Sequence, residues 1–232
     1  MPMEPVRAVV FDLFGTLITY PPGARHVRAM AEKLGVAFED LHPAYQQTRP
    51  RRDSGELDVS QALLVCCEDI GASPSEDQLA AACAELIEFL REILVPREGA
   101  IETLRALRDR GLRIGLVSDA TIEVADLWPG TAFAPLVGAP VFSCEQRVRK
   151  PDPALYRAVC DRLGVKASEC LYVGNGDGDE LAGAKAAGMR ALLFTAPGEY
   201  PGREAAGWQG PRVAHLTALL ERPELHRLPA QT

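Results

Sequence analysis

From residue 96 onward, the chain alternates short apolar runs with segments of helical periodicity. The apolar runs are the predicted strands, at residues 112–117, 141–143, 171–173 and 190–194. The segments between them carry apolar residues every three or four positions, as helices packed on a sheet do. Because strands that alternate with helices pair in parallel, the pattern predicts an α/β fold with a Rossmann-like parallel sheet and helices on both faces. Residues 6–11 form a further apolar run without alternation, typical of a strand that is covered on both faces.

Residues 20–95 interrupt this alternation, because only helical patterns occur there. We expect about four helices in this stretch, the longest opened by a capping box at Ser75. A weaker helix is expected within residues 39–48, starting near Pro43. A final helix of the chain is expected at residues 213–220.

The helical stretch divides the chain into two predicted domains. Residues 1–19 and 96–232 form the sheet-containing core, and residues 20–95 form an inserted all-helical domain. Apolar residues make up 47% of the chain and charged residues 25%, which suits a globular protein and excludes disordered, collagen-like and coiled-coil classes.

Charge and cysteine content limit the partners of the chain. Its net charge is -7, whereas a nucleic-acid-binding protein calls for a basic surface. No apolar run approaches the roughly 18 residues of a membrane span, and Asp12 interrupts the apolar stretch near the start, unlike in a signal peptide. The six cysteines form no Cys-x-x-Cys pair and are expected to be reduced, buried thiols. We therefore expect a cytoplasmic protein with a small-molecule substrate and neither a nucleic-acid nor a membrane partner, while its oligomeric state stays open.

Three predicted strands are followed at their carboxyl ends by polar side chains, those of Asp12, Ser118 and Asn175. In an open parallel sheet, the ligand crevice lies outside the carboxyl ends of the strands. Three strands ending in this way predict one converging site, and a helical insert above that edge would serve as a lid.

Four motifs on these elements resemble those of one family. Asp-Leu-Phe-Gly-Thr-Leu at residues 12–17 resembles the first motif of the haloacid dehalogenase superfamily of hydrolases, and Val-Ser-Asp at residues 117–119 resembles the second. Lys-Pro-Asp-Pro-Ala-Leu-Tyr at residues 150–156 resembles the third. Tyr-Val-Gly-Asn at residues 172–175, continued by Gly-Ala-Lys-Ala-Ala-Gly-Met at residues 183–189, resembles the fourth. All four occur in the family's order, and the helical insert matches the position of the family's cap between motifs one and two.

The resemblance implies roles for individual residues. Asp12 would be the nucleophile that forms a covalent aspartyl intermediate, which water then hydrolyses. Thr16 would brace the turn or bind the phosphoryl group, Ser118 would bind a phosphate oxygen, and Lys150 would stabilise charge on the transferring group. Residues expected beside the substrate are Phe14, Gly15 and Asp119. Further substrate contacts are sought at Tyr20, Arg25 and Arg49.

The family's phosphatases hold a magnesium ion, and the resemblance implies the same cofactor here. The implied ligands are Asp12, the backbone carbonyl of Phe14, Asn175 and Glu180. Asp177 and Asp179 stand close enough in the sequence to replace Glu180 in this role. Because Asn175 supplies oxygen without charge, we expect reduced magnesium affinity.

Two departures from the phosphatase pattern leave three functions open. Phe14 stands where phosphatases carry an aspartate as general acid and base, and general acid–base help is worth about 10²–10⁴-fold. An aromatic residue there, together with Tyr156, resembles the metal-independent two-haloacid dehalogenases, whereas Asp119 and the acid-rich fourth motif do not. The predicted function is a magnesium-dependent phosphatase of a small phosphorylated metabolite. The alternatives are a two-haloacid dehalogenase and a catalytically weakened member that binds a ligand or partner.

Overall fold

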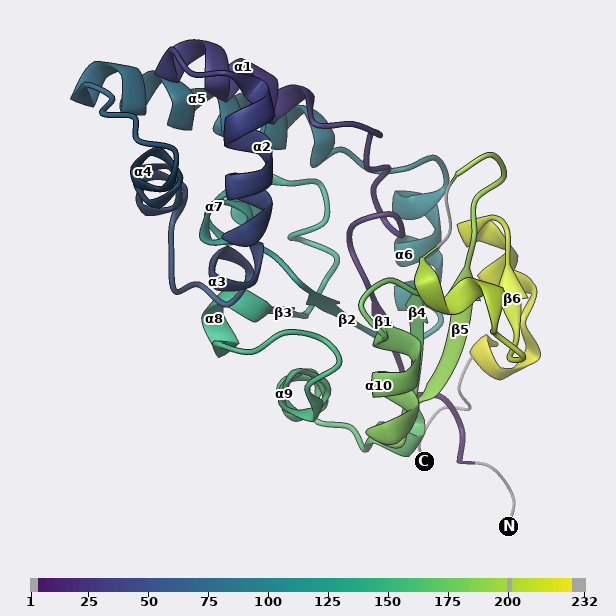
Figure 1. The fold of residues 1–232 in the computed structure, drawn as a ribbon. Helices are drawn as coiled ribbons and strands as arrows, with labels where there is room; N and C mark the ends of the chain where they lie inside the picture. Colours follow the sequence, from purple (N-terminus) through teal and green to yellow (C-terminus); the bar gives the residue numbers. More distant parts are fainter. Residues whose placement is uncertain (1–3, 200–201, 227–232) are drawn as a thin grey trace.

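The computed structural model describes residues 4–199 and 202–226. Its centre is one sheet of six parallel strands in the order β3-β2-β1-β4-β5-β6 (Figure 1). The strands are β1 (Ala8–Phe11), β2 (Arg113–Ser118), β3 (Ala139–Phe142), β4 (Cys170–Gly174), β5 (Arg190–Phe194) and β6 (Arg212–Val213). The predicted α/β fold with a Rossmann-like parallel sheet is confirmed.

The register of the central strand β1 determines where the site lies. Phe11 is opposite Leu116 of β2 and Val173 of β4, so the segments that follow these strands emerge side by side. Strands β2 and β3 lie on one side of β1, and β4, β5 and β6 lie on the other. The carboxyl end of β1 is therefore the point at which the strand order reverses, which is where open parallel sheets bind their ligands.

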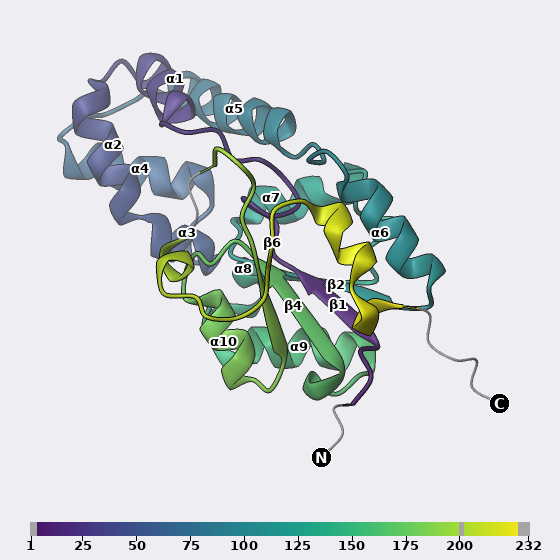
Figure 2. The same ribbon diagram turned by 90° about the vertical axis from the view of Figure 1, so that its right-hand side faces the viewer.

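Helices cover both faces of the sheet, because successive residues of each strand point to opposite sides. Val9 belongs to the apolar cluster that α6 covers, and Val10 belongs to the cluster beneath α9 and α10 (Figure 2). The helices of this part of the chain are α6 (Ala100–Asp109), α7 (Ile122–Leu127), α8 (Ser143–Gln146), α9 (Pro153–Leu163) and α10 (Glu180–Ala186). Every residue of β1 is buried, as the unbroken apolar run predicts.

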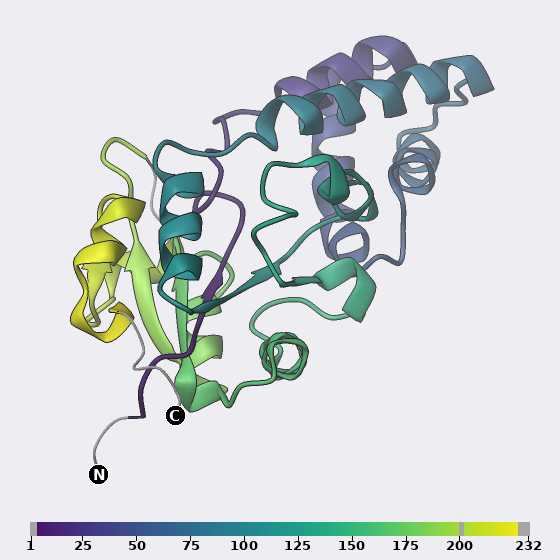
Figure 3. The same cartoon turned by 180° about the vertical axis from the view of Figure 1, so that it is seen from behind.

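Residues 20–95, all of which the structure describes, contain five helices and no strand. They are α1 (Arg25–Leu34), α2 (Phe38–Gln47), α3 (Arg49–Asp53), α4 (Val59–Asp69) and α5 (Glu76–Ile93). The predicted capping box at Ser75 is present, since its hydroxyl accepts from the backbone N–H of Gln78 and the Gln78 side chain accepts from the N–H of Ser75. The five helices lie together beyond the carboxyl ends of the strands, with α3 beside α8 (Figures 1 and 3).

The structure corrects two boundaries. Residues 212–213 form the edge strand β6, and a 3-10 helix at Leu216–Glu221 replaces the expected final helix at residues 213–220. Leu216 and Leu219 are both buried, and their spacing of three suits a 3-10 helix as well as an α-helix, so the apolar pattern alone could not separate them.

The second correction concerns α2, which begins at Phe38 and contains Pro43 as its sixth residue instead of starting near it. The fixed φ of proline is compatible with a helix, so the energetic cost of Pro43 is confined to the preceding turn, where its missing N–H leaves one hydrogen bond unmade. Leu41 and Tyr45 bury the inner face of α2 and stabilise it despite the proline.

Among the described residues, no helix has both the length and the apolar character that crossing a membrane requires.

Candidate active site

Asp12 follows β1 directly, and hydrogen bonds to its backbone N–H and to both carboxylate oxygens fix its position. Its backbone N–H donates to the carbonyl of Val173 on β4 at 2.9 Å. One carboxylate oxygen accepts from the Thr16 hydroxyl at 2.9 Å, and the other accepts from Nζ of Lys150 at 2.7 Å. Asp12 is only 3% exposed, and burial raises its pKa while the ammonium of Lys150 and the hydroxyl of Thr16 oppose the rise. The surrounding donors therefore favour the ionised carboxylate that a nucleophile requires.

Lys150 bridges Asp12 to a second carboxylate, that of Glu180, at 2.6 Å. Glu180 is fully buried, and its carboxylate also accepts from the Tyr172 hydroxyl and from the Gly176 N–H, each at 2.8 Å. Burial raises the pKa of Glu180 to about 7, and the neighbouring charge of Asp12 adds to the shift. Burial disfavours the Lys150 ammonium, but the two carboxylates outweigh it and raise the pKa of Lys150 above its usual range. Both oxygens of Glu180 are thus occupied by protein donors.

Gly15 and Thr16 lie in a tight loop that connects Asp12 to the helical insert. Gly15 has a φ of 79°, in the left-handed region that favours glycine, and a side chain there would overlap the amide of Asn175. The Gly15 N–H donates to the carbonyl of Ile18 at 2.9 Å, which closes the loop. The ends of β1 and β4 are therefore packed together, and Asn175 lies against the nucleophile loop as the strand-end pattern predicts.

Ser118 and Asp119 follow β2 on the other side of Asp12. Ser118 is fully buried, and its hydroxyl makes one long contact, to the carbonyl of Asp119 at 3.4 Å. Asp119 accepts from the backbone N–H of Lys150 at 2.9 Å, and burial raises its pKa. Asp119 therefore positions the loop that carries Lys150.

The acidic residues of the fourth motif differ in their exposure to solvent. Asp177 and Asp179 are exposed, whereas Glu180 is buried. The side-chain oxygen of Asn175 accepts from the Asp177 N–H at 3.2 Å. Within residues 4–199 and 202–226, no three His, Cys, Asp or Glu side chains converge into a cluster that could hold a metal ion.

The ring of Phe14 points towards the helical insert. It packs edge-on against Tyr20, with ring centroids 5.7 Å apart, and Tyr20 packs edge-on against Phe89 of α5 at 6.1 Å. Arg25, by contrast, pairs with Glu92 on the exposed surface of the insert. Of the three sought substrate contacts, Tyr20 therefore reaches the nucleophile loop directly.

Asp53 of α3, which the sequence does not single out, joins the insert to the core. Its carboxylate contacts Nε of Arg49 at 3.3 Å and Nη2 of Arg149 at 3.1 Å. Its carbonyl accepts from the hydroxyl of Ser143, which also accepts from the Ala120 N–H at 2.9 Å. Because Arg149 precedes Lys150, this ion pair links the insert to the third motif. Arg49 is a local partner, four residues before Asp53, whereas Arg149 and Ser143 are distant in the sequence and only the fold brings them to Asp53.

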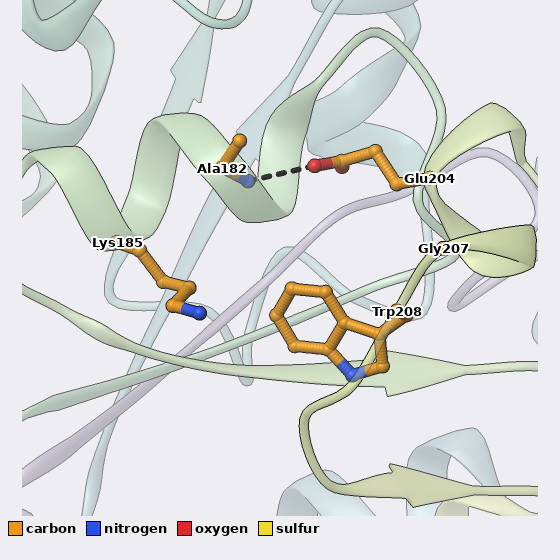
Figure 4. A pocket seen from close by; sticks show the side chains of 5 residues that line it. All are labelled: Ala182, Lys185, Glu204, Gly207 and Trp208. Atoms are coloured by element: carbon orange, nitrogen blue, oxygen red, sulfur yellow. Dashed lines mark hydrogen bonds between the residues drawn. The ribbon is translucent and has the colours of Figure 1, made fainter.

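Glu204 is a second residue that sequence reasoning missed. Its carboxylate accepts from the backbone N–H groups of Leu181 and Ala182 at 2.7 and 2.8 Å, at the start of α10 (Figure 4). Its own N–H donates to the carbonyl of Gly176 at 3.0 Å, so it braces the fourth-motif loop from outside. An open pocket of about 490 Å³ lies there, beside Lys185 and Trp208. None of the residues that line this pocket belongs to the cluster around Asp12.

Asp12 is thus a buried carboxylate between a lysine and a threonine at the switch point of a parallel sheet, which is where such sheets bind their ligands. The model of the haloacid dehalogenase-like hydrolase family matches residues 6–188, and the chain belongs to that family. The predicted family and the prediction of a hydrolase are both confirmed.

Named relatives fall into two reaction classes. The chain is 31% identical over 197 residues to a phosphoglycolate phosphatase of Rhodospirillum rubrum, covering 82% of this chain and 79% of that protein. It is 28% identical over 241 residues to (S)-2-haloacid dehalogenase 1 of a Pseudomonas species, covering 96% and 97%. The structure of a 2-haloacid dehalogenase from Pseudomonas syringae covers 93% of this chain and 97% of that one, with a TM-score of 0.69 and 23% identity, which supports the fold.

Proposed function

We propose that this protein is a magnesium-dependent phosphatase of small phosphorylated metabolites, with Asp12 as the nucleophile. The observation that carries the proposal is the buried Asp12 carboxylate, oriented by Thr16 and charge-balanced by Lys150. The 31% identical relative is named a phosphatase that acts on a small phosphorylated acid, which supports the same class of substrate.

Three of the four implied ligands fit a magnesium ion. Asp12 offers a carboxylate, Asn175 offers an amide oxygen, and among the described residues the carbonyl of Phe14 accepts no hydrogen bond. Mg²⁺ commonly takes one or two carboxylates and completes its shell with water and substrate phosphate. Glu180 differs, because it is fully buried and its carboxylate already accepts three hydrogen bonds, from Lys150, Tyr172 and the Gly176 N–H. In our proposal Glu180 therefore acts through Lys150, which it holds against Asp12.

The proposed reaction has two steps on Asp12. A carboxylate oxygen of Asp12 attacks phosphorus, the bond from phosphorus to the ester oxygen breaks, an aspartyl phosphate forms, and the alcohol leaves with a proton taken from water. Water then attacks this phosphorus and releases inorganic phosphate, which regenerates Asp12. Lys150 and the Ser118 hydroxyl face the transferring group and stabilise its charge. Bound Mg²⁺ would supply further neutralisation of that charge.

We also propose that residues 20–95 are a cap over a core of residues 1–19 and 96–232. Asp53 supports this division, because it pairs with Arg149 of the core from α3. Gly55 supports it too, since its carbonyl accepts from Arg147 and a side chain at Gly55 would overlap the backbone of Cys144. With the cap in this position, Asp12 is 3% exposed, so substrate entry requires the cap to move.

The second candidate function is that of a two-haloacid dehalogenase. Phe14 favours it, because a phenyl ring cannot donate a proton and halide, unlike an alkoxide, leaves without one. The contact between Phe14 and Tyr20 supports an apolar wall on this side of Asp12. The relative that covers 96% of this chain is named a dehalogenase of this kind.

One activity panel decides between the two reactions. Phosphomonoesters and two-haloacids are each incubated with magnesium and with a chelator, and phosphate and halide release are measured. Phosphate release that depends on magnesium supports the proposal. Halide release that persists in chelator contradicts it in favour of the dehalogenase. No turnover of either class would favour a binding protein with a weakened active site.

A further inference from the structure

Arg97 lies in the linker between α5 and α6, where the chain returns from the helical insert. Its side chain is only 9% exposed and points into the loop that follows Asp12. Nε donates to the carbonyl of Thr16 at 2.9 Å, and Nη2 donates to the carbonyls of Gly15 and Ile18 at 3.2 and 3.3 Å. The Arg97 N–H adds a fourth bond, to the carbonyl of Leu17 at 2.9 Å. One residue thus holds four successive carbonyls of the nucleophile loop.

Glu199 holds the Arg97 guanidinium from the other side. Its two carboxylate oxygens lie 2.5 Å from Nη1 and 2.8 Å from Nη2, a bidentate arrangement. The guanidinium also lies over the ring of Phe194, 4.9 Å from its centroid. Glu199 and Phe194 belong to the end of β5 and the turn that follows it. Arg97 therefore joins three segments that are far apart in the sequence.

The two linkers of the insert line an open hollow on the surface, beside Arg97. A hollow of about 270 Å³ separates Thr19 and Pro21 of the first linker from Val95 and Pro96 of the second. Apolar packing also contributes nearby, because Ile18, Ile93 and Leu94 are buried in one apolar cluster. Arg97 adds directed hydrogen bonds from the second linker to the loop after Asp12.

We propose that Arg97 is a positioning residue, which holds the loop of residues 13–18 so that Thr16 orients the Asp12 carboxylate and Gly15 packs against Asn175. Glu199 in turn keeps the Arg97 guanidinium in place. This inference rests on the proposed role of Asp12 as the nucleophile. The planar, rigid fork of arginine is what allows one side chain to donate to several carbonyls and pair with a carboxylate at once. Lysine carries the same charge without that geometry.

The test compares Arg97→Ala and Arg97→Lys with a matched control, Arg110→Ala. Arg110 also donates to two backbone carbonyls, those of Leu220 and Leu225, but on the opposite end of α6. Misplacing the nucleophile by about 1 Å costs roughly 10²-fold in rate, so we expect kcat to fall by that order in both Arg97 variants. KM should change far less, because Arg97 contacts no substrate. Added guanidinium ion should restore part of the activity of Arg97→Ala, and Arg110→Ala should keep the wild-type kcat.

Hydrogen exchange of the loop amides gives a readout that does not depend on turnover. We expect residues 13–18 to exchange faster in Arg97→Ala and, more weakly, in Glu199→Gln, with no change there in Arg110→Ala. Unchanged exchange in Arg97→Ala would overturn the inference, as would a kcat loss matched by Arg110→Ala. If the wild-type protein hydrolyses nothing in the panel above, the proposed function fails, while faster loop exchange still establishes the positioning contact.

Discussion

The cluster around Asp12 and the interior of the helical insert differ in how completely their buried polar groups are hydrogen-bonded. Around Asp12, Lys150 and Glu180, each charged group has at least two partners within hydrogen-bonding distance. In the insert, the Tyr45 hydroxyl and Nδ1 of His26 are buried without a hydrogen-bond partner among the described residues. An unpaired buried polar group lowers the stability of the fold. Natural proteins tolerate such groups because they are rarely at their stability optimum. The charged groups of the Asp12 cluster are therefore fully paired, whereas the insert, like core residues outside that cluster such as Thr103 and Thr195, contains buried groups without a partner among the described residues.

Replacing Asp12 with Asn should have the largest effect on activity of all the substitutions in the Asp12 cluster. The change keeps the shape of the side chain and removes the nucleophilic charge, so kcat should fall by about 10³-fold or more. The control is Asp177→Asn, which removes an exposed acid from the neighbouring loop. Phosphate release and circular dichroism are measured for both variants. Substantial turnover by a folded Asp12→Asn protein would refute the covalent mechanism.

Replacing Phe14 with Asp introduces a proton donor where the nucleophile loop meets the helical insert. If the site hydrolyses phosphate esters, turnover should rise by up to about 10²-fold for poor leaving groups such as sugar alcohols. Aryl phosphates leave without protonation and should gain less. Phe14→Leu serves as the control, because it removes the contact with Tyr20 without adding an acid. A folded Phe14→Asp protein that is slower on both substrate types would show that no acid is missing at this position.

Replacing Asp53 with Asn weakens the junction of the two regions without changing its shape. The variant loses the charge that pairs with Arg49 and Arg149, and the free energy of unfolding should fall by about 1–2 kcal/mol. Glu56→Gln is the control, since Glu56 pairs with Arg51 on the exposed surface and such pairs contribute about 0–1 kcal/mol. Urea denaturation measures both. Equal losses in the two variants would contradict a special role for Asp53.

Acid should weaken the insert through His26, with a smaller effect than the substitutions above. Burial lowers the pKa of His26 to about 4 from its ordinary 6.5, and nearby Arg52 contributes. The neutral ring therefore suits the fold, and its stabilising contribution is complete above pH 6.5 and is lost as pH falls towards 4. His26→Phe keeps the stacking on Phe89, whose centroid is 4.4 Å away, and removes the titration. Melting temperatures from pH 7 to pH 4 should fall less in the variant, and parallel curves would exclude His26 as the cause.

Local patterns predicted the parts of this molecule that depend on local residues. The strand ends at Asp12, Ser118 and Asn175 and the capping box at Ser75 could be read directly, because spacing along the chain determines them. Residues that act through distant partners left no such signal. Arg97 reads as a charged linker residue and Glu204 as a surface acid, yet their partners lie 81 and 23 positions away. The roles assigned to Ser118, Asn175 and Glu180 remain predictions.

The position of β1 has a consequence for how the chain is made. β1 is the central strand of the sheet, but its neighbours β2 and β4 begin at Arg113 and Cys170. During synthesis, β1 therefore leaves the ribosome long before either partner exists, while the five helices of residues 20–95 form from contacts close in sequence. We expect the insert to acquire structure first, with the apolar β1 segment unpaired until β2 has been translated, at about half of the chain, and paired on one side only until β4 follows, at about three quarters. Since an unpaired hydrophobic strand is prone to aggregation during that interval, we expect the rate of translation through residues 96–174 to affect the yield of folded protein.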